Sequence, residues 1–285
     1  MKHKGVDIYR DGYNFLKHNR SSRVYVYLLP VFVLFVLLSF AGKASGEIPT
    51  EYDLKKQSLI QNLKEKGFSE EESNRLFSDE RVVLYPEILE KKGKGLNYMS
   101  KRFGLLSRKS IKRGQKVISD NKDFLDSIEK EYGVDKEVIV AIYRVETNLG
   151  QSRGGYLVFN SLLTRVLIEN RRSEWAEREL INLLLLCKSK GLDPLTLKGS
   201  WAGAFGLCQF IPSSAMTHAV DGNKDGDVDL FNFHDAMASI ANYLKANGWD
   251  KKDTEKKKKA IWSYNHCDNY VKAVLAYARA SKKSR

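Results

Sequence analysis

The residue best suited to chemistry is Glu146, which follows a mostly apolar run, residues 138–145. If this stretch is helical, Ile139, Ile142 and Tyr143 share the face of that carboxyl group, and this is the face that a helix normally buries. Burial disfavours the ionised form of a carboxyl group, so its pKa rises and it can donate a proton near neutral pH. The sequence therefore offers Glu146 as a general acid. The alternative is a helix-end residue that extends into solvent.

Two further segments carry polar groups suited to binding. Residues 199–214 are rich in glycine, alanine and serine, which let a backbone approach a ligand or a neighbouring helix closely. Ser200 and Gln209 are the polar side chains that this small-residue segment would present, although a helix-packing loop explains the composition equally well. Tyr264 and Asn265 form a pair that often holds a sugar, with the ring on an apolar face and the amide on a hydroxyl group. The neighbouring His266 is more readily structural than catalytic.

Residues 221–232 follow the twelve-residue pattern of an EF-hand calcium loop, with glycine at the sixth position. Its four aspartates would repel one another unless a cation lay between them, which favours a metal site over a plain turn. An asparagine replaces the bidentate glutamate at the twelfth position, so we expect a weakly bound calcium ion with a structural role. The expected ligands are Asp221, Asn223, Asp225, Asp227 through its backbone carbonyl, Asp229 and Asn232.

Composition limits the class of protein. The 285 residues can form one large or two small domains, and 42% hydrophobic residues with five prolines indicate a helix-rich globular protein. Of the formal charge of +13, residues 1–46 carry +5, which leaves +8 on the remainder. A basic body suits an anionic polymer or a membrane surface. No helix-turn-helix, finger or RNA-binding signature supports nucleic acid as a partner. The three cysteines lack metal-ligand spacing, so one disulfide or buried free thiols are both open.

The N-terminal region predicts export. Residues 24–40 are uncharged and would span about 25 Å as a helix, and Ala41 and Gly42 bring this close to the thickness of a bilayer. Lysines and arginines before this segment keep the N-terminus cytoplasmic and place the rest of the chain outside. Either a cleaved signal peptide or an inner-membrane anchor over residues 24–42 fits. We expect a periplasmic protein in both cases.

Elsewhere the periodicity predicts a mainly α fold, since no period-2 strand pattern recurs. We expect a break at Gly67, a capping box at 69–72 and a solvated face or loop at the lysine run 256–259. Asp135 is expected to cap the helix that leads to Glu146. Expected helices cover 52–77, 107–132, 135–147, 175–188, 235–247 and 260–281. The expected domains are 1–46 (cytoplasmic leader and signal or anchor segment), 47–118 (an N-terminal helical region) and 119–285 (the catalytic domain).

Several motifs in a fixed order carry a family resemblance. They are Tyr132-Gly133-Val134-Asp135, the segment 145–150, the small-residue segment, the calcium-type loop, Ala241-Asn242-Tyr243-Leu244 with Gly248-Trp249, and Tyr264-Asn265. Together they resemble the membrane-bound lytic murein transglycosylase B family, lysozyme-like enzymes of bacterial cell walls. The resemblance runs from about residue 52 to 278 and is strongest after residue 132. The chain departs from the family pattern at Cys208, at His266-Cys267 and at Asn232.

The resemblance implies a mainly α, lysozyme-like catalytic domain with an N-terminal helical extension and an EF-hand-like loop, with at most a short ribbon near that loop. It implies that Glu146 is the single catalytic acid, and that Ser200, Gln209, Tyr243, Tyr264, Asn265 and Tyr98 line a saccharide groove. The implied reaction cleaves the β-1,4 bond between N-acetylmuramic acid and N-acetylglucosamine in peptidoglycan and forms a 1,6-anhydromuramyl end. No cofactor is expected for catalysis, and a monomer acting on glycan strands is expected.

Two alternatives remain open at the level of sequence. A muramidase, which hydrolyses the same bond, would need a second carboxyl group, and Asp268 is the candidate. A non-catalytic wall-binding protein could use the same fold, but binding alone gives no reason to keep Glu146 on an apolar face.

Overall fold

The computed structural model describes residues 50–91, 97–168 and 170–282, which all belong to one compact unit, Pro49–Arg285. The charged leader and the apolar segment 24–42 lie outside the described residues. Within the described ranges, no helix combines the length and the apolar character needed to cross a bilayer.

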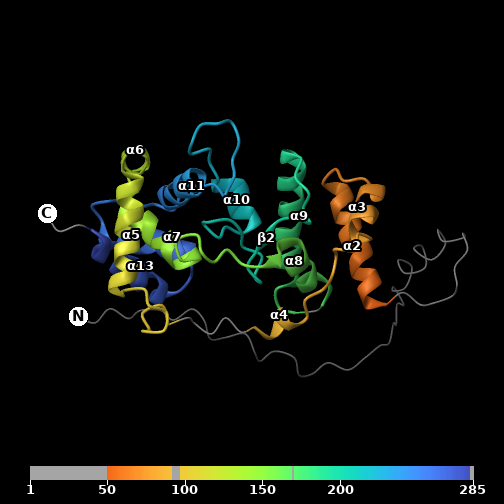
Figure 1. Ribbon diagram of the computed structural model, residues 1–285. Coiled ribbons are helices and arrows are strands. Elements are labelled where there is room, and N and C mark those ends of the chain that lie inside the picture. Colours follow the sequence, from red (N-terminus) through yellow and green to blue (C-terminus); the bar gives the residue numbers. More distant parts are fainter. Residues whose placement is uncertain (1–49, 92–96, 169, 283–285) are drawn as a thin grey trace, which may run out of the picture. The chain divides into compact units, whose positions relative to one another are not determined.

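The described residues are mostly helical, as the sequence predicts (Figure 1). The two short strands β1 and β2 pair antiparallel, with Tyr156 opposite Gly199 and Leu157 opposite Lys198. This ribbon opens the small-residue segment, whereas the calcium-type loop, near which we expected it, holds no strand among the described residues. The elements are α2 (Glu51–Glu65), α3 (Glu70–Phe77), α4 (Glu87–Glu90), α5 (Arg108–Asp120), α6 (Lys122–Tyr132), α7 (Lys136–Thr147), β1 (Tyr156–Leu157), α8 (Val158–Leu167), α9 (Ser173–Lys190), β2 (Lys198–Gly199), α10 (Pro212–His218), α11 (Phe233–Ala246), α12 (Thr254–Tyr264) and α13 (Asp268–Ser281).

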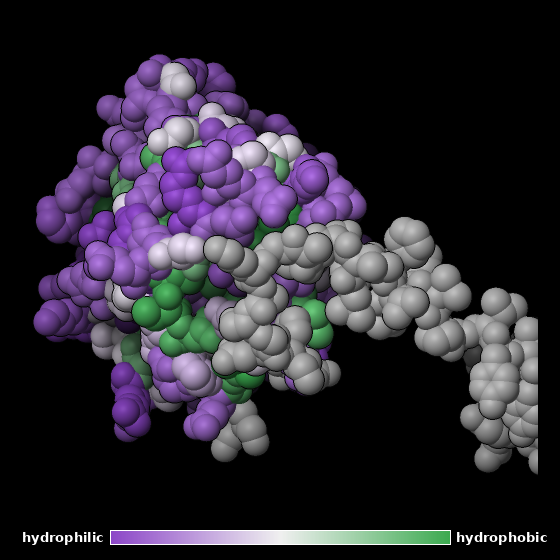
Figure 2. Space-filling view, turned by 90° about the vertical axis from the view of Figure 1, so that its right-hand side faces the viewer, coloured by the Kyte–Doolittle hydropathy of each residue, from purple (hydrophilic) through white to green (hydrophobic). Residues whose placement is uncertain are grey.

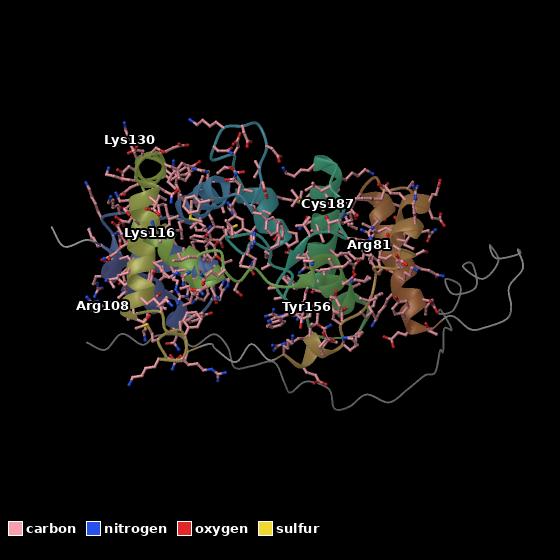
Figure 3. All side chains as sticks on the ribbon, viewed as in Figure 1. Arg81, Arg108, Lys116, Lys130, Tyr156 and Cys187 are labelled. Atoms are coloured by element: carbon pink, nitrogen blue, oxygen red, sulfur yellow. The ribbon has the colours of Figure 1, made fainter. Side chains whose placement is uncertain are left out.

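Local signals set several of these boundaries. The capping box predicted at the start of α3 is confirmed, since Ser69 accepts from the backbone of Glu72 while the Glu72 side chain accepts from the backbone of Ser69. Gly133 ends α6 in the left-handed conformation at φ 72°, which glycine adopts without steric cost. Beyond α3, Arg81 pairs with Asp79 and with Asp193, and so fastens this linker to the segment after α9 (Figure 3).

Three predicted elements were wrong in detail. The helix expected over 107–132 is two helices, because Asn121 leaves the helical conformation and its side chain bonds back to the carbonyl of Val117. The helix expected over 260–281 is interrupted between α12 and α13. The lysine run 256–259 is part of α12, which Asp253 caps, and three of its four lysines are exposed, so it is a solvated face and not a loop. Asp135 precedes α7 without capping it, since its carboxylate pairs with Lys257 instead.

The proposed boundary at residue 118 falls within α5, and the division at that point stays a prediction. The three cysteines are free thiols, and two of them, Cys187 and Cys208, are buried. On the face shown in Figure 2 the surface is predominantly hydrophilic, with apolar residues gathered in patches. Polar residues on the surface and apolar residues in the interior are usual for a globular protein.

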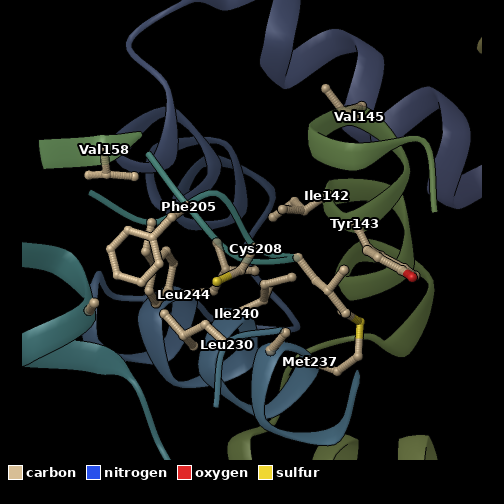
Figure 4. Close-up of a cluster of buried hydrophobic side chains, with 14 of the residues drawn as sticks. Ile142, Tyr143, Val145, Val158, Phe205, Cys208, Leu230, Met237, Ile240 and Leu244 are labelled. Atoms are coloured by element: carbon tan, nitrogen blue, oxygen red, sulfur yellow. The ribbon is translucent and has the colours of Figure 1, made fainter. Parts of the chain in front are cut away.

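Helix α7 lies at the centre of the core and packs against α5, α6, α11 and α13. Ile139 and Ile142 have no exposed surface, and burying each such side chain stabilises the fold by roughly 1.5–3 kcal/mol. The small-residue segment and α11 complete this cluster, with Cys208 and Ile240 toward Ile142 of α7 and Phe205 on the side of Val158 (Figure 4). A helix held on so many sides fixes the direction of the side chains at its end, including Glu146.

Candidate active site

Glu146 lies in the last turn of α7, on the edge of the core. Part of its side chain stays accessible to solvent, yet protein atoms surround the carboxyl group closely. Burial raises the pKa of Glu146 to about 7, and a hydrogen bond from Tyr270 acts in the opposite direction by stabilising the ionised form. The Tyr270 hydroxyl donates to Oε1 of Glu146 over 2.6 Å. Near neutral pH both protonation states of this carboxyl group are therefore populated.

The backbone after Glu146 is tied to the small-residue segment. The buried Thr147 hydroxyl lies 3.1 Å from the Tyr143 carbonyl and 3.3 Å from the Leu207 carbonyl, and it accepts from the N–H of Gly150. Gly150 has φ 80°, and a Cβ there would lie 2.6 Å from the hydroxyl oxygen of Tyr143. This close packing holds the end of α7 against the loop that carries Gln209.

Three tyrosine rings from two distant parts of the chain, Tyr98 on one side and Tyr264 with Tyr270 on the other, lie around the carboxyl group. Tyr270 has no exposed surface, stacks on Tyr264 with ring centroids 6.3 Å apart and meets Tyr98 edge to face at 5.6 Å. The Asn265 side-chain amide lies 3.4 Å from the Tyr98 hydroxyl, and burial raises the pKa of Tyr98 to about 12. The structure thus places Tyr98, Tyr264 and Asn265 beside Glu146.

A pocket of about 470 Å³ adjoins this cluster. Three of the predicted groove residues line it, namely Gln209, Tyr243 and Tyr264. The hydroxyls of the two tyrosines donate to backbone carbonyls, at Ser263 over 2.7 Å and at Cys208 over 2.6 Å. These bonds fix the two rings at the wall of the pocket.

Gln209 sits in the left-handed region at φ 52°, and its amide donates to the Gly206 carbonyl over 2.8 Å. The side-chain carbonyl oxygen is the part left for a ligand. Ser200 differs from the prediction in position, because its hydroxyl accepts from the N–H groups of Ala204 and Ala202 and it is not part of the pocket lining. It shapes the turn after β2, and its binding role stays a prediction.

Sequence reasoning missed several residues at the site. Tyr270 falls within the helix expected over 260–281, and no sequence pattern relates it to a carboxyl group 124 positions earlier. Arg172, Trp175 and His266 also line the pocket, which brings α9 to the site as well as α12. An arginine and a tryptophan at the start of a helix are too common a pattern to have identified Arg172 and Trp175, and the sequence alone favours a structural role for His266.

The calcium-type loop does not gather its predicted ligands. Asp221 accepts backbone N–H bonds from Lys224 and Gly226, and Asp227 pairs with Lys190. Asn232 caps α11 by accepting from the N–H of His234. Within the described ranges, no three acidic, histidine or cysteine side chains approach closely enough to hold a metal ion. The other predicted ligands bond locally: Asn223 to Asp225, Asp225 also to the N–H of Asp227, and Asp229 to the N–H of Phe231.

A residue beyond the twelve-position pattern faces this loop. Asp235, in the first turn of α11, is 1% exposed, and its carboxylate accepts from the N–H groups of Gly222 and Asp229. With Asp235 the donor set consists of oxygen atoms, the ligands that calcium prefers. The oxygen atoms are therefore of the kind that binds calcium, while in this structure they accept hydrogen bonds from N–H groups of the loop itself.

Asp268, the candidate for a second carboxyl group, is exposed at the start of α13. It lines a different concave surface, between α12 and α13, whereas the pocket beside the tyrosine cluster is lined by neither Asp268 nor Glu146. Among the described residues no other carboxylate contributes to the raised pKa of Glu146. The arrangement offers one carboxyl group for proton transfer.

Comparisons with family models, curated proteins and solved structures all match this chain to transglycosylases. Residues 51–258 match the family model of the transglycosylase SLT domain. The membrane-bound lytic murein transglycosylase B of Escherichia coli (strain K12) is 38% identical over 161 residues, which are 56% of this chain and 44% of that protein. The match thus spans less than half the length of this relative.

Solved structures extend the likeness over most of the chain. The Escherichia coli lytic transglycosylase Slt35 in complex with bulgecin A superposes with a TM-score of 0.73 at 26% identity, covering 80% of this chain and 92% of that one. The same enzyme in complex with calcium superposes with a TM-score of 0.71 at 26% identity, with the same coverage.

Proposed function

Because the chain belongs to the transglycosylase SLT domain family, we propose that it is a lytic transglycosylase that acts on peptidoglycan. It cleaves the β-1,4 bond between N-acetylmuramic acid and N-acetylglucosamine and leaves a 1,6-anhydromuramyl end. The observation that carries this proposal is Glu146, a single carboxyl group with a pKa of about 7 beside a pocket lined by aromatic rings.

In the first step Glu146 acts as the acid. Its protonated carboxyl group donates to the glycosidic oxygen while the bond from that oxygen to the anomeric carbon of the muramyl residue breaks. The developing negative charge then rests on the Glu146 carboxylate, and the hydrogen bond from Tyr270 stabilises it. The Tyr270 hydroxyl therefore contributes most when Glu146 is ionised, which is the state between the two proton transfers.

In the second step the same carboxylate acts as the base. The muramyl 6-hydroxyl oxygen attacks the anomeric carbon, and Glu146 accepts the proton of that hydroxyl. The ring closes to the 1,6-anhydro product without consuming water, and Glu146 returns to its protonated form. A pKa near 7 suits both roles, because neither proton transfer is strongly uphill.

Among the residues that the structure describes, no second carboxylate affects the pKa of Glu146, which supports this reaction over hydrolysis. Glycoside hydrolases of the usual kinds place two carboxyl groups about 5–9.5 Å apart across the scissile bond. Asp268 lines a separate surface, and the aspartates of the calcium-type loop bond within that loop. With Glu146 as the one group proposed for proton transfer, an internal nucleophile supplied by the substrate replaces activated water.

Mass analysis of muropeptides after digestion tests the proposal. We expect anhydro ends from the full chain, and reducing ends in their place would show a hydrolase. Glu146→Gln should abolish cleavage while glycan binding persists, because the amide cannot donate and retrieve the proton. Glu137→Gln, on the same helix, is the matched control and should retain activity.

A structural calcium ion belongs to the same proposal. Asp221, Asn223, Asp225, Asp229 and the buried Asp235 would supply its oxygen ligands, with the backbone carbonyl of Asp227 and with Asn232 at the edge of the loop. Its chemistry would be to neutralise the loop and hold it against α11. A relative of known structure was crystallised with calcium, which supports this assignment.

We place the catalytic unit outside the cytoplasm, held at the inner membrane by residues 24–42 unless the segment is cleaved. The name of the Escherichia coli relative, a membrane-bound enzyme, supports membrane association. Fractionation of cells that express the full chain tests it, since a cytosolic fraction holding the bulk of the protein would contradict export.

A further inference from the structure

A second concave surface lies next to the pocket, between α12 and α13, and it has no part in the function proposed above. It encloses about 420 Å³, close to the 470 Å³ of the pocket and within the range of ligand sites in proteins. We name it the α12–α13 groove and define it by Trp262, the lysines Lys258, Lys259 and Lys272, and the carboxylates Glu255 and Asp268.

Trp262 is an exposed aromatic residue in this groove. Its side chain is 42% exposed, although a tryptophan in a globular protein is ordinarily well buried. The ring packs edge to face against His266, with centroids 4.2 Å apart, and His266 lines the pocket beside Glu146. The Trp262–His266 pair therefore stands between the pocket and the groove, with one residue facing each.

The polar groups of the groove suit a sugar chain that carries acidic substituents. Glu255 and Asp268 can accept hydrogen bonds from hydroxyl groups, and an exposed indole ring can cover the apolar face of a pyranose. Lys258 pairs with Glu255 over 2.8 Å, so Lys259 and Lys272 are the cations of the groove left to attract a carboxylate. Glycan strands of the wall bear peptide stems with such carboxylates.

We propose that the α12–α13 groove binds the same glycan strand beyond the part held in the pocket. The strand passes the Trp262–His266 pair, stacks one sugar on Trp262 and directs a stem-peptide carboxylate toward Lys259 and Lys272. This inference rests on the proposed function, because it names a further part of the same substrate. A phospholipid surface fits less well, since a head group offers no pyranose face for the exposed Trp262 ring to cover.

The test compares strand lengths in the full chain carrying Glu146→Gln, purified in detergent, so that binding is measured without cleavage. Peptidoglycan strands are separated by length, and dissociation constants are measured for tetrasaccharides and for strands of ten or more sugars. Trp262→Ala should weaken binding of the long strands about threefold to tenfold and leave tetrasaccharide binding unchanged. Trp262→Phe, which keeps a ring, should restore most of that loss.

Lysine variants test the charged part. Lys259→Gln with Lys272→Gln should weaken binding of long strands that keep their peptide stems, and should not affect strands from which an amidase has removed them. Tyr52→Ala, at an exposed aromatic residue of α2, is the control for Trp262→Ala. Lys109→Gln, at an exposed lysine of α5, is the control for the lysine variants. Both should leave binding unchanged.

Equal loss for short and long strands, or no loss for either, would overturn the groove proposal. The proposal would also be overturned if Trp262→Ala lost binding to phosphatidylglycerol vesicles while its glycan binding stayed unchanged, because the groove would then bind lipid. Failure of the proposed function has a separate signature, because the chain with Glu146 intact would then release no anhydro ends from any strand.

Discussion

Replacement of Tyr270 by phenylalanine tests how the active-site acid is tuned. The change removes the hydroxyl that donates to Glu146 over 2.6 Å and keeps the ring that stacks on Tyr264. This hydrogen bond lowers the pKa of Glu146 against the effect of burial, which raises it to about 7. Without the bond the pKa must rise further.

The size of the effect follows from the strength of the bond. A hydrogen bond to a charged group contributes about 1.5–3 kcal/mol, and 1.36 kcal/mol corresponds to one pH unit. The pKa of Glu146 should therefore rise by about 1 to 2 pH units. The protonated acid would persist to higher pH, while the ionised state needed for the second step would lose stabilisation.

The assay is the rate of anhydro-muropeptide release as a function of pH. In Tyr270→Phe we expect the alkaline limb of the profile to move upward by about 1 to 2 pH units, together with a lower maximal rate. Tyr277→Phe is the matched control, because Tyr277 is a buried tyrosine of the same helix whose hydroxyl donates to the Ser110 carbonyl. An unchanged or downward-shifted limb in Tyr270→Phe would refute the role given to this hydroxyl.

Three further outcomes follow from the same structure. Burial raises the pKa of Glu146 from 4.5 to about 7, so the free energy of unfolding falls as the pH rises through this window. Glu146→Gln should therefore be more stable than the wild type by up to about 3 kcal/mol at pH 8 but not at pH 4. Equal differences in the free energy of unfolding at both pH values would count against a buried acid. If calcium holds the loop beside Asp235, a chelator should lower the melting temperature and added calcium should restore it, whereas a melting temperature indifferent to both would contradict the site. Gly150→Ala should destabilise the fold by about 1–3 kcal/mol, as measured by urea denaturation, because of its positive φ and the close Tyr143 hydroxyl, while Gly155→Ala, in open space, should cost less.

The sequence predicted features that depend on neighbours along the chain. The capping box at Ser69 and the helix end at Gly133 follow from residue types a few positions apart, and both are confirmed. The buried face of α7 follows from helical periodicity, since Ile139 and Ile142 have no exposed surface. The mainly α, lysozyme-like fold is confirmed by the family match and by the solved structures. The same local reasoning failed where a single side chain interrupts a helix, as at Asn121, because periodicity on either side continues unbroken.

Tertiary structure alone decided which distant groups meet. Position in the sequence does not relate Tyr270 to Glu146, yet their hydrogen bond helps to set the pKa of the acid. The Ser200 hydroxyl accepts a hydrogen bond from the N–H of Ala204 in the turn after β2. Asp235 accepts from the N–H of Asp229 in the calcium-type loop, although it lies three positions beyond the twelve-residue pattern. The physical reason is that helix periodicity and capping arise from interactions within a few residues, whereas a carboxyl group takes its pKa and its partners from whatever the packing of α7 and α13 brings beside it.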